Sequence, residues 1–73
     1  MKRYVLLCTT FAGQRTYGIG YMETDGKTAF LLACYADLSP NRAPVRRFVY
    51  RCNLMRLDPL HLPDAVEDFL ADL

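Results

Sequence analysis

The first half of the chain contains three apolar segments of strand length, and this pattern limits the fold more than any other feature. Each segment is rich in β-branched and aromatic residues, which favour strands. The Asp25-Gly26 pair is a strong hairpin signal, and residues 12–15 supply an earlier turn. The sequence therefore predicts a three-stranded antiparallel meander, with strands at Arg3–Thr10, Tyr17–Glu23 and Thr28–Ala36.

The predicted strands carry apolar residues on both faces of the sheet. A face open to water would instead alternate with polar residues along each strand. In the third strand, Leu31 and Tyr35 share one face, and Leu32 and Cys34 lie on the other. We therefore expect both faces to be covered, one by a helix and the other by a second copy of the chain. The residues expected at the interface between copies are Tyr17, Ile19, Tyr21, Leu31 and Tyr35.

The second half of the chain predicts two amphipathic helices. The first has an apolar stripe at helical spacing, formed by Val45, Phe48, Val49 and Cys52. Asn41 is its expected N-cap, which puts Pro44 at the third position, where its missing N–H is tolerated. The second stripe consists of Val66, Phe69, Leu70 and Leu73. The predicted fold is α+β in the order β-β-β-α-α, a single small domain over residues 1–73 with at least one helix packed on the sheet.

The length and composition of the chain favour self-association. A domain of 73 residues buries a small core, yet 52% of its residues are apolar. The apolar surplus predicts a homodimer. The net charge of +1 gives no general attraction to nucleic acid or to acidic membranes.

Three widely spaced cysteines predict buried, reduced thiols in a cytoplasmic protein rather than a disulfide framework. Residues 1–13 superficially resemble a signal peptide. Their apolar run is short, is interrupted by Thr9 and Thr10, and lacks a convincing cleavage site, so we expect no export. No apolar run approaches the 18 or more residues that cross a bilayer.

Charge is sorted between the two predicted helices. Five arginines are the only charged residues of the segment 41–56, whereas the segment 57–73 has five carboxylates and no lysine or arginine. Opposite blocks favour packing of the two helices side by side. An alternative use of the basic block is contact with nucleic acid. The residues expected to make that contact are Arg42, Arg46, Arg47 and Arg51.

The remaining candidate groups predict no catalytic, cofactor or metal site. His61 is the only histidine, and no potential ligands are spaced around it as in a metal site. We therefore expect His61 to be part of a helix-opening turn. The carboxylates from Asp64 to Asp72 follow the polar face of a helix. Gly18 and Gly20 alternate within a strand and do not form a phosphate-binding loop. They are expected to let a helix or a second chain approach the sheet closely.

Three motifs together resemble a family of small uncharacterised bacterial proteins of the domain-of-unknown-function class. The motifs are the strand TYGIGY, the Asp37-Leu38-Ser39 turn with the helix behind it, and the closing segment LDPLHLPDAVEDFL. The resemblance covers residues 16–73 and implies the same order of elements, with no activity or site. Asp58-Pro59 matches the family's helix start, but Pro63 is a departure. A continuous helix from Asp58 and a short turn followed by a helix from Pro63 are both compatible with the sequence.

These features predict a non-enzymatic protein–protein interaction module that associates with itself through an apolar sheet face. The alternative is a small nucleic-acid-binding regulator that uses the arginine-rich helix of residues 42–56. No cofactor is expected in either case.

Overall fold

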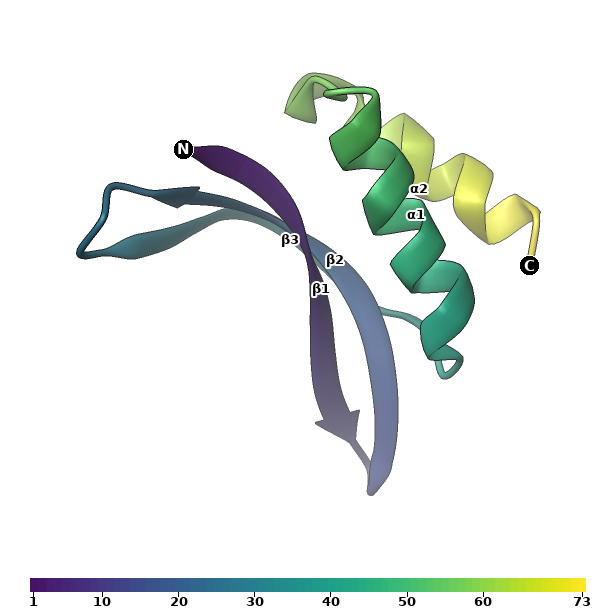
Figure 1. The fold of residues 1–73 in the computed structure, drawn as a ribbon. Helices are drawn as coiled ribbons and strands as arrows, with labels where there is room; N and C mark the ends of the chain where they lie inside the picture. The colour runs from purple at the N-terminus through teal and green to yellow at the C-terminus, as the bar shows by residue number, and fades with distance from the viewer.

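The computed structural model describes all 73 residues. Its strands form one antiparallel sheet in the order β1-β2-β3, and both helices lie on the same side of it (Figure 1). The predicted α+β class and β-β-β-α-α order are confirmed. Neither helix has the length and apolar content needed to cross a membrane. The elements are β1 (Lys2–Phe11), β2 (Gln14–Thr24), β3 (Ala29–Ser39), α1 (Arg42–Leu54), the 3-10 turn η1 (Pro59–His61) and α2 (Leu62–Ala71).

Two tight turns connect the strands. Ala12 and Gly13, with φ of 52° and 79°, form a two-residue turn with a twist suited to a hairpin. In the second turn, the Asp25 carboxylate accepts hydrogen bonds from the backbone N–H and hydroxyl of Thr28, and these bonds lower the pKa of Asp25. The strands are longer than predicted because the polar residues at their ends still pair through their backbones.

An irregularity in β3 shapes the end of the sheet. Ile19 pairs with Tyr35 and Tyr17 pairs with Ser39, so β3 has two more residues than β2 in this stretch. The extra length is taken up near Asp37, whose φ is 58°. The β3 backbone comes so close to Gly18 that a Cβ there would meet the carbonyl oxygen of Tyr35. The Asp37-Leu38-Ser39 segment, which the resemblance implies is a turn, thus continues the strand through a bulge.

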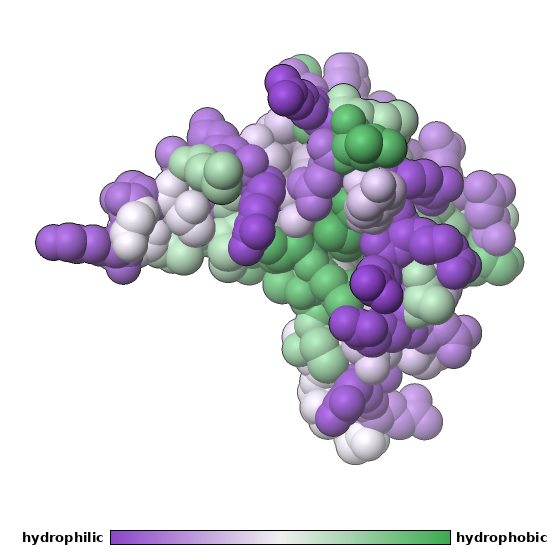
Figure 2. All heavy atoms as spheres, in the orientation of Figure 1, coloured by the Kyte–Doolittle hydropathy of each residue, from purple (hydrophilic) through white to green (hydrophobic).

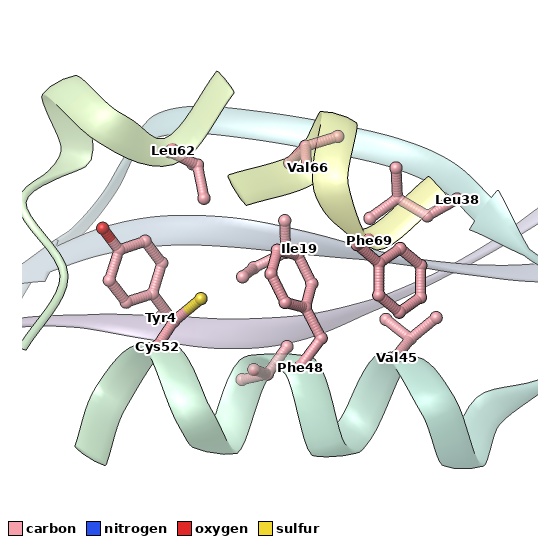
Figure 3. Packing of buried hydrophobic residues seen from close by; sticks show 10 residues of the cluster. Tyr4, Ile19, Leu38, Val45, Phe48, Cys52, Leu62, Val66 and Phe69 are labelled. Carbon is pink, nitrogen blue, oxygen red and sulfur yellow. The ribbon is translucent and has the colours of Figure 1, made fainter. Parts of the chain in front are cut away.

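The hydrophobic core lies between the sheet and the two helices (Figure 3). The predicted stripe of α1 is confirmed, because all four of its residues are buried. The prediction for α2 was partly wrong. Leu70 and Leu73 are 47% and 63% exposed, and the buried stripe is Leu62, Val66 and Phe69. The ring of Phe69 stacks on that of Phe48 at 4.8 Å between centroids, which joins the two helices.

The segment from Asp58 to Ala71 is divided into the short turn η1 and the helix α2. The Asp58 carboxylate accepts a hydrogen bond from the backbone N–H of Leu60 and thereby caps η1. The chain turns at His61, and α2 starts at Leu62 with Pro63 in its first turn. Of the two starts that the sequence left open, the structure has the short turn followed by a separate helix.

The side chain of Asn53 clamps the outer edge of β1. Its Oδ1 accepts a hydrogen bond from the backbone N–H of Tyr4 at 2.8 Å, and its Nδ2 donates to the carbonyl of Tyr4 at 2.9 Å. An amide side chain therefore takes the place of a neighbouring strand at this residue. The clamp also fixes the end of α1 against the sheet.

Candidate interaction surface

The side of the sheet away from the helices has no cover within the chain, and we call it the open face. The strand register defines it, because Val5, Gly20 and Cys34 lie side by side on it, as do Met22 and Leu31. The sheet is sharply bent, and the open face lies inside the bend (Figure 1). Figure 2 shows hydrophobic atoms, in green, lining the inside of this bend. The residues of the open face are Val5, Leu7, Gly18, Gly20, Met22, Leu31 and Cys34.

Leucine side chains fold over the centre of the open face. A Cβ on Gly20 would lie 2.7 Å from Cδ1 of Leu31 and 3.3 Å from the methyl groups of Leu7. The glycine thus leaves room for two leucines from the neighbouring strands to converge. Leu31 remains 47% exposed. Arg3 at one end, and the Thr9–Thr16 hydroxyl pair at 3.0 Å near the other, give the apolar centre a polar rim.

The structure corrects most of the predicted interface. Ile19 is fully buried, with 0% exposure, so it has no surface to offer a partner. Tyr17, Tyr21 and Tyr35 lie on the same side as Ile19, half-buried against the core. Only Leu31 of the predicted set is on the open face. The error has two physical causes. Two apolar faces look alike in sequence, and only the packing of α1 shows which one is covered. The expectation that Leu31 and Tyr35 share a face was also wrong, because a register shift opposite Tyr21 and Met22 puts them on opposite faces.

The chain exposes more surface than a compact monomer of its size. A folded protein of 8.4 kDa is expected to expose about 4,600 Å². The exposed area here is 5354 Å², a surplus of about 700 Å². The radius of gyration, 12.1 Å, likewise exceeds the value of about 11 Å for a compact domain of this length. Figure 1 shows two arms of the bent sheet that extend beyond the helices and so add to the exposed surface.

A second surface, the arginine face, lies on the solvent side of α1. It consists of Arg42, Arg46, Arg47 and Arg51 together with Tyr50, all of them exposed. The two helices are neighbours, but they meet through the stacked rings of Phe48 and Phe69 and not through the sorted charges. No arginine side chain takes part in a hydrogen bond, so the carboxylates of α2 do not engage it.

The nucleophilic and titratable groups do not gather at one place. Cys8 and Cys34 are exposed and Cys52 is buried, which corrects the expectation that all three thiols are buried. Burial raises the pKa of the Cys52 thiol and keeps it protonated at neutral pH. His61 is exposed, and its ring makes no hydrogen bond. No group of three or more His, Cys, Asp or Glu side chains is placed to hold a metal ion.

The ionisation of Tyr4 makes the stability of the fold depend on pH in the alkaline range. Burial, followed by the nearby Cys52, raises the pKa of its hydroxyl from 10.0 to about 12. Because the folded protein holds this proton more tightly than the unfolded chain does, the contribution of Tyr4 to the stability is constant below about pH 10 and falls between about pH 10 and pH 12. The expected loss is about 2 to 3 kcal/mol. Chemical denaturation across this range should show the loss, whereas Tyr4→Phe should remove it and the exposed Tyr50→Phe should keep it.

Comparison of the chain with protein-family models, curated proteins and solved structures returned no match. The open face and the arginine face are the two candidate interaction surfaces of the chain.

Proposed function

We propose that the protein is a non-enzymatic interaction module that forms a homodimer through the open face. The observation that carries the proposal is the uncovered apolar centre of that face, with Leu7 and Leu31 converging over Gly20. An apolar patch with a polar rim is typical of a protein–protein contact. The residues of the contact are then those of the open face and not the tyrosines of the helix side.

A second copy fits this face in both area and charge. The surplus exposed surface of the whole molecule, about 700 Å², is comparable with the roughly 800 Å² that each partner buries in a standard interface. The centre of the open face is uncharged, and the one charged residue that β1 and β2 place on this face is Arg3, which pairs with Met22 at the end of the face. Two identical faces can therefore meet without like charges at their centre, as an interface with two-fold symmetry requires.

Leu31→Lys tests the interface. Each dimer would bury two added charges, so the variant is expected to sediment as a monomer at micromolar concentrations at which the parent protein is a dimer. Leu60→Lys is the matched control, because Leu60 is 79% exposed on η1, on the helix side of the molecule, and its replacement should leave the dimer intact. A parent protein that is monomeric at these concentrations and binds no hydrophobic dye would refute the proposal.

The two exposed cysteines provide an independent measurement on the unmodified protein. Cys34 lies on the open face, whereas Cys8 pairs with Tyr17 on the other side of the sheet. Dimerisation should therefore slow the alkylation of Cys34 as the protein concentration rises. The alkylation rate of Cys8 should change much less. Equal behaviour of the two thiols would place the contact somewhere other than the open face.

A further inference from the structure

The arginine face has a concentration of positive charge that the rest of the chain does not share. Four arginines lie within the 13 residues of α1, and the helix contains no acidic residue. Figure 2 shows the strongly hydrophilic atoms, in deep purple, over this helix. The net charge of the whole chain is only +1, and Asp72 lines a hollow together with Arg47 and Arg51, so the positive potential is greatest at the part of α1 away from Asp72.

The guanidinium groups of this face are available to a ligand. None of them takes part in a hydrogen bond with another side chain or with the backbone. A guanidinium group has five N–H donors, which match the oxygens of phosphate groups. The arginine face therefore presents several unused donors side by side.

Most of the arginine positions oppose the stability of the helix. Arg42 lies in the first turn, at the positive end of the helix dipole, where carboxylates are favoured, whereas Arg51 lies in the last turn, where a cation is favourable. The pairs Arg42/Arg46 and Arg47/Arg51 each put like charges four residues apart on the helix, which is unfavourable. Asn41 makes no side-chain capping bond that would compensate. Stability alone does not explain this arrangement, and a departure from local preference of this kind is expected where a surface serves a function.

An exposed tyrosine lies among the arginines. Tyr50 is 65% exposed and, with Ala43, Arg46 and Arg47, lines a shallow hollow of about 270 Å³. An aromatic ring beside cationic groups is the combination that binds single-stranded nucleic acid, since the ring stacks on a base while the cations contact the phosphates. In a duplex the bases are stacked on one another and their faces are not accessible to such a ring. Tyr50 therefore favours a single strand.

We propose that the arginine face binds single-stranded nucleic acid. Arg46, Arg47 and Arg51 contact successive phosphates, and Tyr50 stacks on an unpaired base. The proposal does not depend on self-association, because α1 and the open face lie on opposite sides of the sheet.

Fluorescence anisotropy with a labelled oligothymidylate tests the phosphate contacts, with titrations between about 50 and 200 mM salt. Arg46→Ala/Arg47→Ala is expected to reduce the slope of log K against log salt concentration by about 1.4, or about 0.7 for each lost contact. Arg15→Ala/Lys27→Ala removes the same charge from exposed positions outside α1 and should leave the slope unchanged. Equal reductions of this slope in the two double variants would overturn the proposal, as would the absence of binding at low salt.

The same titrations test the stacking. Tyr50→Ala is expected to weaken binding of the oligothymidylate about tenfold with no change of slope, and Tyr50→Phe should retain the affinity. A duplex of the same length should bind more weakly and should not respond to Tyr50→Ala. Binding of polyglutamate as tight as that of the oligonucleotide would identify a general surface for acidic polymers and would overturn the proposal. Circular dichroism is expected to show an intact helix in each variant, because every substituted α1 residue is exposed.

Discussion

Gly18→Ala is expected to destabilise the fold by about 3 kcal/mol or more, a large part of the stability of a domain of this size. The added Cβ would clash with the carbonyl oxygen of Tyr35 and would lie 2.8 Å from Cα of Ala36. Both are backbone atoms of β3, and the bulge that they belong to carries Leu38 into the core. The strand cannot move away without losing its pairing with β2. Urea denaturation followed by circular dichroism measures the loss.

Gly20→Ala is the matched control, two residues along the same strand. Its Cβ would approach only the ends of Leu31 and Leu7, at 2.7 and 3.3 Å, and these flexible side chains can change rotamer on the open face. The expected cost is below about 1 kcal/mol, because the loss of chain entropy in the unfolded state partly offsets the displacement of the leucines. Similar losses of stability in Gly18→Ala and Gly20→Ala would show that the close contact with the β3 backbone is not the reason why a glycine is needed at position 18.

Asn53→Asp is expected to cost about 2 to 4 kcal/mol. The carboxylate still accepts the hydrogen bond from the N–H of Tyr4, but its second oxygen replaces a donor and faces the carbonyl oxygen of Tyr4. A favourable contact therefore becomes a repulsive one at the point where α1 is joined to the edge of the sheet. Denaturation at neutral pH measures the effect.

The control for this substitution is Asn41→Asp, which makes the same chemical change at the other end of α1. Asn41 makes no side-chain capping bond, and a negative charge beside a helix N-terminus is favourable. We expect no loss of stability and a small gain. A similar loss from both substitutions would mean that the clamp contributes nothing specific.

The order of elements was predictable because local signals and tertiary packing agree. The Asp25-Gly26 pair specifies a turn in almost any context. The stripe from Val45 to Cys52 permits only one face of α1 to be buried, and the structure buries that face. In each of these cases the sequence pattern has a single structural solution.

Other features depend on contacts between distant segments, which no local pattern encodes. The face of the sheet that α1 covers is set by tertiary packing, so Ile19, which is fully buried, was wrongly assigned to a partner. The bulge requires Gly18 and Tyr35 to meet across two strands. The role of Asn53 was also missed. An exposed polar residue in the last turn of a helix gives no sign in sequence that it bonds to the first strand.

The clamp between Asn53 and Tyr4 also determines the order in which the molecule can assemble. The sheet contacts join strands connected by short turns, so closing them costs little chain entropy. The clamp joins residues 49 positions apart and forms only when α1 docks. During synthesis the meander can therefore pair while the backbone of β1 at Tyr4 is still unprotected. That edge is exposed to other chains for as long as α1 has not emerged and folded.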